Sequence, residues 1–140
     1  MAILEIRKYP ERVLLQKAFP VRSVEEVQTL IDDMVQTMYA APGVGLAAPQ
    51  VGVAQRIIVI DVSGDEPELP LIVLINPEIK QAEGSVDSEE GCLSLPDFRT
   101  KVGRAEWVVV EELDRKGGPV RIEAEGLLSI ALQHEIDHLN

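Results

Sequence analysis

Two histidines and a glutamate near the end of the chain have the spacing of a metal-dependent hydrolytic site. His134 and His138 are four residues apart, so on a helix they share one face, with Cβ atoms about 5–6 Å apart. That separation allows both imidazoles to bind one metal ion. Glu135 lies about 100° further round the helix axis, where it is a poor ligand but can exchange protons with a bound water. The alternative interpretation is that the two histidines are merely polar residues on an ordinary amphipathic helix, with no metal between them.

A catalytic site of this type has three protein ligands and a water, so the two histidines leave one ligand to find. The sequence contains no other histidine, and only Leu139 and Asn140 follow His138. The third ligand is therefore expected upstream, and it is either Cys92 or a carboxylate. A lone cysteine is usually an ordinary buried residue, but coordination chemistry favours Cys92, the single cysteine of the chain.

Residues 43–50 contain two closely spaced glycines and superficially match a dinucleotide-binding fingerprint. That fingerprint follows a strand and opens a helix. Here the order is reversed, because a predicted helix precedes the glycines and a predicted strand follows them. We interpret the glycines as positions where the backbone can approach a ligand or another strand.

The spacing of apolar residues predicts three helices. A short helix is expected over residues 12–17. A longer amphipathic helix is expected over residues 24–40, opened by a capping box of Ser23 and Glu26. The last helix opens near Gly126 and carries both histidines. The first half of that helix has almost no polar face, which predicts that it is buried.

Strands are predicted where apolar and β-branched residues cluster, over residues 56–62, 71–75 and 105–113 and again from Val120 onward. Asn76 and Pro77 are expected to close the second strand, and residues 78–90 to form a strand pair that turns at residues 83–84. Residues 114–118 form a predicted hairpin turn. The predicted fold class is α+β, with short antiparallel strands packed around a central C-terminal helix.

Length and composition are those of one soluble domain. The 140 residues suffice for one domain and are too few for two, and 46% hydrophobic and 26% charged residues are ordinary values. No apolar run has transmembrane length and no signal peptide is recognisable, so a reducing, cytoplasmic setting is expected for the single cysteine. The net charge of −11 argues against general affinity for nucleic acid or anionic membranes.

Three segments of the chain occur in the order of a known family's motifs. They are residues 43–50, residues 90–94 (Glu-Gly-Cys-Leu-Ser) and residues 133–138 (Gln-His-Glu-Ile-Asp-His). Together they resemble the three motifs of the peptide deformylase family, and residues 9–10 and 102–104 fit it as well. The resemblance implies a metal-dependent hydrolase that removes the formyl group from N-formyl-methionine at the start of newly made polypeptides and releases formate.

The same resemblance implies roles for individual residues. Glu135 would move the proton during hydrolysis, and the side-chain amide of Gln50 and the backbone N–H of Leu93 would donate to the oxyanion. The metal would be Fe(II), with Ni, Co or Zn also accepted. Its ligands would be Cys92, His134 and His138.

An apolar slot for the methionine side chain is expected beside the metal site. Its walls are predicted to come from residues Val44, Gly45, Gly91, Leu127, Ile130 and Ala131, any of which can instead belong to the core. Ser88 stands where related enzymes tend to have an apolar residue. Glu90 and Arg104 are expected to form a structural ion pair that braces the cysteine segment, while Asp137 either supports a ligand or faces water.

Bacterial relatives continue beyond the position of Asn140, and some dock on the ribosome through a C-terminal segment. We therefore expect residues 1–140 to form a single catalytic domain that lacks the usual C-terminal extension, without ribosome docking through a C-terminal helix. Formyl-methionyl nascent peptides are the expected partners.

Two other functions fit parts of the pattern. A metallopeptidase usually takes its third ligand from beyond the helix. A non-catalytic metal-binding domain with the same fold would close its fourth position with another ligand, and the presence of Glu135 and Gln50 argues against it.

Overall fold

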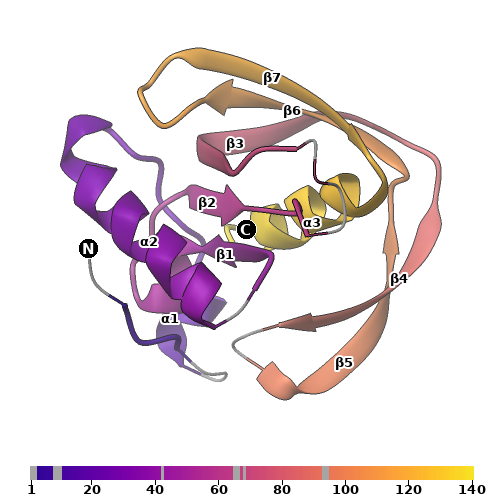
Figure 1. Ribbon diagram of the computed structural model, residues 1–140, viewed down its shortest axis with the longest axis horizontal. Coiled ribbons are helices and arrows are strands. Elements are labelled where there is room, and N and C mark those ends of the chain that lie inside the picture. Colours follow the sequence, from indigo (N-terminus) through magenta and orange to yellow (C-terminus); the bar gives the residue numbers. More distant parts are fainter. Residues whose placement is uncertain (1–2, 8–10, 42, 65–66, 68, 93–94) are drawn as a thin grey trace.

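The computed structural model describes residues 3–7, 11–41, 43–64, 67, 69–92 and 95–140, and gives the backbone alone for Leu15, Cys92 and residues 95–100. Its helices are α1 (Arg12–Leu15), the 3-10 turn η1 (Glu25–Val27), α2 (Gln28–Ala40), the 3-10 turn η2 (Ala48–Val51) and α3 (Gly126–Asp137). Its strands are β1 (Gly45–Ala47), β2 (Ile57–Ile60), β3 (Ile72–Glu83), β4 (Val86–Cys92), β5 (Leu95–Arg104), β6 (Trp107–Leu113) and β7 (Pro119–Glu125) (Figure 1).

The strands form two antiparallel sheets. Five of them pair in the order β1-β2-β3-β6-β7, and β4 and β5 form a separate two-stranded sheet. Helix α3 lies inside the curve of the strands in Figure 1. The predicted α+β class is confirmed, although β3 and β5, with 12 and 10 residues, are longer than the short strands expected.

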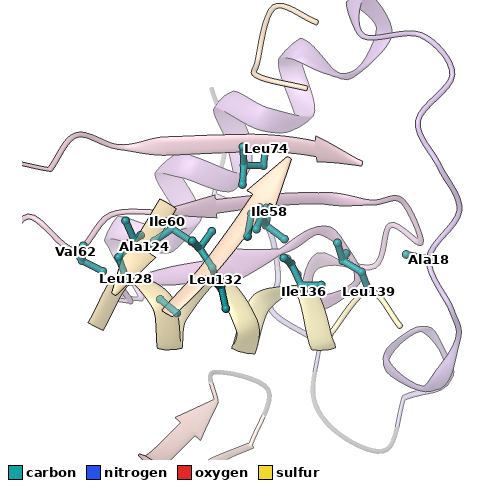
Figure 2. Close-up of a cluster of buried hydrophobic side chains, with 14 residues drawn as sticks. Ala18, Ile58, Ile60, Val62, Leu74, Ala124, Leu128, Leu132, Ile136 and Leu139 are labelled. Carbon is teal, nitrogen blue, oxygen red and sulfur yellow. The ribbon is translucent and has the colours of Figure 1, made fainter. Parts of the chain in front are cut away.

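Strand β2 separates two hydrophobic layers because its side chains point alternately to opposite faces. Ile58 and Ile60 pack with the apolar side of α3 (Figure 2). Ile57 and Val59 pack with the apolar side of α2. All four side chains are fully buried. The sheet is thus held between α2 and α3, which fixes the position of the helix that carries the histidines.

The helices agree with the sequence pattern in place and differ in detail. Helix α1 ends at Leu15, two residues early, because Gln16 is extended. The first turn of the 24–40 segment is the 3-10 turn η1, and its N-cap is Val24 with no side-chain cap. The predicted capping box of Ser23 and Glu26 is therefore wrong. Helix α3 begins at Gly126 as predicted.

Strand β3 does not stop at Asn76 and Pro77, contrary to the prediction. Asn76 adopts a positive φ of 56°, and the register with β6 shifts between Ile75 and Glu78. The Asn76 side chain accepts from the Val21 N–H at 2.7 Å and donates to the Val21 carbonyl at 3.1 Å. A bulge braced in this way absorbs a proline that has no N–H to give to the ladder.

The strand pair predicted within residues 78–90 is also wrong. Strand β3 pairs with β6, whereas β4 pairs with β5. Strands β1 and β5 were not predicted at all. The alternation of apolar and polar residues marks strands with one buried face, and it is weak in both segments.

None of the described helices has the length and apolar character needed to cross a membrane.

Candidate metal-binding active site

Helix α3 brings the imidazoles of His134 and His138 together. Their Nε2 atoms are 3.3 Å apart and their ring centroids 4.9 Å apart. His134 Nδ1 lies 2.7 Å from Glu90 Oε1, so the carboxylate keeps the ring proton on Nδ1. The Nε2 lone pair of His134 therefore faces His138, which is the arrangement that two imidazoles binding one metal ion need.

Burial keeps the second imidazole neutral. Loss of solvation, followed by repulsion from His134, lowers the pKa of His138 to about 4. A neutral ring keeps the lone pair that a metal requires.

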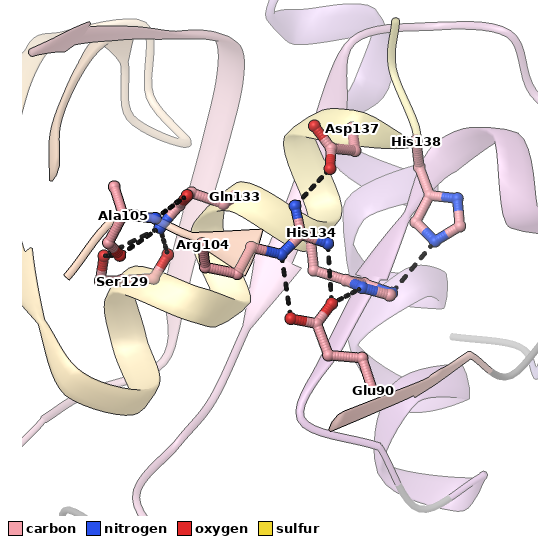
Figure 3. A network of polar contacts seen from close by, with 8 residues as sticks. All are labelled: Glu90, Arg104, Ala105, Ser129, Gln133, His134, Asp137 and His138. Carbon is pink, nitrogen blue, oxygen red and sulfur yellow. Dashed lines mark hydrogen bonds and ion pairs between the residues drawn. The ribbon is translucent and has the colours of Figure 1, made fainter. Parts of the chain in front are cut away.

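Glu90 is the hub of a charged network beneath His134 (Figure 3). Its Oε2 accepts from Arg104 Nε at 2.9 Å and its Oε1 from Arg104 Nη2 at 2.7 Å. Burial alone would raise the pKa of Glu90, but hydrogen bonds from Arg104, His134 and Ser88 lower it to about 2. The expected Glu90–Arg104 ion pair is present, with both side chains less than 10% exposed.

Asp137 was expected either to support a metal ligand or to face water, and the structure shows features of both. Its side chain is 61% exposed, and its carboxylate pairs with Arg104 Nη1. It thus holds the guanidinium that holds Glu90.

Glu135 carries a buried carboxyl group next to the histidines. The residue is 5% exposed, and among the described residues no group hydrogen-bonds its Oε1 atom. Burial, with a further contribution from the charge of Glu90, raises the pKa of Glu135 to about 8, although Arg104 offsets part of this. A buried acid without a partner is costly to a fold, and such groups concentrate at functional sites.

Gly45 of β1 leaves room for that carboxyl group. A Cβ atom at position 45 would lie 2.6 Å from Glu135 Oε2 and 3.0 Å from its Cδ and Cγ atoms. The glycine that the sequence assigned to a substrate slot is therefore also in contact with Glu135.

Replacing Gly45 by alanine should displace the Glu135 carboxyl and lower kcat roughly 10–100-fold, since displacements of about 1 Å have costs of this size. Metal stoichiometry should stay unchanged because the imidazoles are not touched. Gly64→Ala is the matched control, because nothing lies within 4 Å of a Cβ atom there. Equal kcat values for the two variants would show that the contact does not matter.

Gln50 lies in η2 and is 2% exposed. Its Oε1 accepts from the Ala47 N–H at 3.0 Å, and its backbone carbonyl accepts from the Arg7 N–H at 2.6 Å. The side-chain oxygen is thus committed to β1, the strand that packs Gly45 against Glu135. The amide nitrogen is the donating end of this side chain.

The cysteine segment is described only in part. The backbone of Cys92 ends β4, two residues after Glu90 and so within about 7 Å of it along the strand. The Cys92 side chain and all of Leu93 lie outside the described residues. Among those that are described, no three His, Cys, Asp or Glu side chains are grouped as metal ligands.

The residues predicted to line a methionine slot differ in burial. Ala131 belongs to the core around α3 and Leu127 packs against it. Ile130 is half-buried, Gly91 is exposed, and Val44 is 47% exposed.

Sequence reasoning placed Gln133 in the motif of residues 133–138 but gave it no role, whereas the structure shows it buried and bonded to Ser129 and Ala105. The available signal was a glutamine four residues after a serine within a helix that is otherwise rich in apolar residues.

Comparisons with known proteins agree over the whole chain. The sequence model of the family described as "Polypeptide deformylase" matches residues 3–140. A peptide deformylase of Thermodesulfovibrio yellowstonii is 59% identical over 141 aligned residues, which cover 100% of this chain and 86% of that protein.

The chain belongs to the polypeptide deformylase family.

Solved deformylases have the same fold. The enzyme from Legionella pneumophila is 52% identical, with a TM-score of 0.93 over 99% of this chain and 82% of that one. The enzyme from Synechococcus elongatus, in complex with actinonin, is 45% identical, with a TM-score of 0.92 over 98% of this chain and 76% of that one. This deformylase is thus an enzyme of a metal-dependent family that removes the formyl group from newly made polypeptides.

Proposed function

We propose that this deformylase hydrolyses N-formyl-methionine at a site in which Cys92, His134 and His138 hold one divalent metal ion and Glu135 transfers the proton. The observation that carries the proposal is the pair of Nε2 atoms 3.3 Å apart beside a buried carboxyl group. The donors fit a metal, because both imidazoles are on one face and one of them is oriented by a carboxylate.

Cys92 is the favoured third ligand because the carboxylates of Glu90 and Asp137 are engaged, and Glu135 points away from the face that the two imidazoles share. Both oxygens of Glu90 bond Arg104 or His134, and Asp137 pairs with Arg104. Cys92 follows Glu90 on the same strand, within reach of the imidazoles. A thiolate with two imidazoles is a set that suits Fe(II) and Zn, and we propose Fe(II), with Ni, Co and Zn as substitutes.

A metal ion held by these residues would supply Lewis-acid chemistry, which lowers the pKa of a water and polarises a carbonyl group. The charge of a metal ion held there would oppose the burial that raises the pKa of Glu135 and so favour its carboxylate form. Glu135 can then accept at its Oε1 atom the proton that the attacking water loses, and give this proton to the departing amine of the methionine. Glu90 holds the Nδ1 proton of His134, which fixes the ring. The burial that raises the pKa of Glu135 also excludes competing solvent.

The oxyanion that develops on the formyl group needs donors fixed in advance. Gln50 is suited to this, because the Ala47 N–H holds the side-chain oxygen and so determines which end of the amide donates. The Leu93 backbone N–H is the proposed second donor. The Val44–Gly45 wall and the residues of α3 before His134 are proposed to receive the methionine side chain.

Gln50→Glu should lower kcat roughly a hundredfold or more, because one oxyanion donor contributes about 3–4 kcal/mol. The carboxylate can still accept from the Ala47 N–H, so the fold should be retained. Gln50→Ala loses both the bond from Ala47 and the proposed donation to the oxyanion. Steady-state kinetics and thermal unfolding of the two variants check this. A Gln50→Glu enzyme with the wild-type kcat would exclude Gln50 as a donor.

Formate release from formyl-Met-Ala-Ser tests the function directly. We expect formate from this peptide and no cleavage of unformylated Met-Ala-Ser. Cleavage of internal peptide bonds would instead indicate a metallopeptidase, and metal binding without formate release a non-catalytic domain. Elemental analysis of anaerobically purified protein identifies the metal.

The proposed setting is a single catalytic domain in the cytoplasm, where new polypeptides are made. Formyl-methionyl nascent peptides are its partners, and the acidic net charge of −11 disfavours direct contact with nucleic acid.

A further inference from the structure

Gln133 makes a set of hydrogen bonds that the catalytic chemistry does not use. Its Oε1 accepts from the Ala105 N–H at 2.9 Å, and its Nε2 lies 2.9 Å from the Ala105 carbonyl oxygen. The same Nε2 is 3.0 Å from both the backbone oxygen and the Oγ atom of Ser129, and that hydroxyl donates to the Ala105 carbonyl at 3.1 Å. Figure 3 shows these contacts on the side of Arg104 away from His138.

The side-chain amide thus pairs with both polar groups of one residue, as a neighbouring strand would. Ala105 directly follows Arg104, and Gln133 directly precedes His134. The buried amide of Gln133 therefore ties the residue before His134 to the residue after Arg104. His134 and Arg104 are the two ends of the Arg104–Glu90–His134 chain of contacts.

The β6–β7 ladder fixes where α3 begins, because Glu125, the residue before the helix, pairs with Trp107. Further along the helix, the inner face packs through apolar side chains such as Leu132 and Ile136, and this packing is non-directional. Directional contacts between the His134 turn of α3 and residues 104–105 come from Gln133 and Asp137. A displacement of this turn by about 1 Å would break the 2.7 Å contact between His134 and Glu90.

We propose that Gln133 is a positioning residue. It holds the His134 turn of α3 against Ala105, the residue after Arg104, so that Arg104 reaches Glu90 and Glu90 holds His134 Nδ1. The inference rests on the proposed function, because it assigns Gln133 to the support of a metal ligand.

Gln133→Met keeps the volume and removes the pairing. We expect the affinity for Zn²⁺, titrated into metal-free protein against a chelating dye, to fall about 10-fold or more, the usual cost of losing support for a ligand. The slowly exchanging Nδ1 proton of His134 should disappear from the NMR spectrum of the metal-free protein. Thr37→Val is the matched control, since Thr37 is 1% exposed and bonds Leu4 and Asp33 far along the chain from this site. It should change neither readout. Gln133→Asn, too short to span Ala105, serves if the methionine variant does not fold.

A double-mutant cycle with Arg104→Gln separates positioning from general stability. If Gln133 acts through Arg104, Gln133→Met should have little further effect on Zn²⁺ affinity in the Arg104→Gln background. Independent, additive losses would overturn the proposal, as would a retained Nδ1 proton in Gln133→Met. Failure of the proposed function has a different signature, because wild-type protein would then release no formate while the Zn²⁺ and NMR comparisons still gave a result.

Discussion

Glu135→Gln should lower kcat by about 10²–10⁴-fold, the usual contribution of a positioned acid–base group, while the metal content stays that of the wild type. The amide has the size of the carboxyl but accepts no proton at neutral pH, and the ligands are left intact. Formate release and elemental analysis of the same preparations check both parts. A loss of metal equal to the loss of activity would show that Glu135 is a ligand or a structural support instead.

The same substitution should change how the stability of the metal-free protein depends on pH. The pKa of Glu135 is raised to about 8 in the fold, against an ordinary value of 4.5, so the folded form retains a proton that the unfolded form loses between these values. Stability therefore falls as pH rises from about 5 to 8.

Glu135→Gln lacks this loss, so its stability relative to the wild type should rise by on the order of 3 kcal/mol between pH 5 and pH 8.5. Chemical denaturation of chelator-treated protein at the two pH values measures the difference. Glu25→Gln changes an exposed carboxyl and is the control. An unchanged difference for Glu135→Gln would mean that its carboxyl ionises in the fold as it does in water.

Cys92→Ala should remove the bound metal and, with it, nearly all activity. Loss of a supporting contact costs about 10–100-fold in metal affinity, and loss of a direct ligand should exceed this. Metal stoichiometry after gel filtration, together with Zn²⁺ titration, gives the measurement. The imidazoles of His134 and His138 should remain paired, because α3 is held by its own core contacts.

Cys92→Asp is the second variant to compare, because it offers the metal ion a carboxylate from nearly the same place as the thiolate. We expect partial recovery of metal binding relative to Cys92→Ala. Full metal occupancy in Cys92→Ala would indicate that the third ligand is a carboxylate, the alternative that coordination arithmetic leaves open.

Local spacing in the sequence determined the parts of this protein that depend on neighbours along the chain. The i, i+4 histidines share a face because a helix has 3.6 residues per turn, and the β-branched run of β2 is a strand with both faces buried. The ordered motifs also gave the family, and the glycine segment gave a close approach of backbone, which the structure places at Glu135.

Only the tertiary structure decided the contacts between distant segments. Strand β4 lies outside the main sheet and pairs with β5. This pairing places Glu90 of β4 against His134, which is 44 residues away in the sequence. Gly45 and Glu135 meet across 90 positions, and Gln133 bonds Ala105 in the link between β5 and β6. The bulge at Asn76 depends on Val21 in the same way. The physical reason is that sequence periodicity specifies which face of an element is buried, whereas the partner of a polar group depends on how several elements pack together.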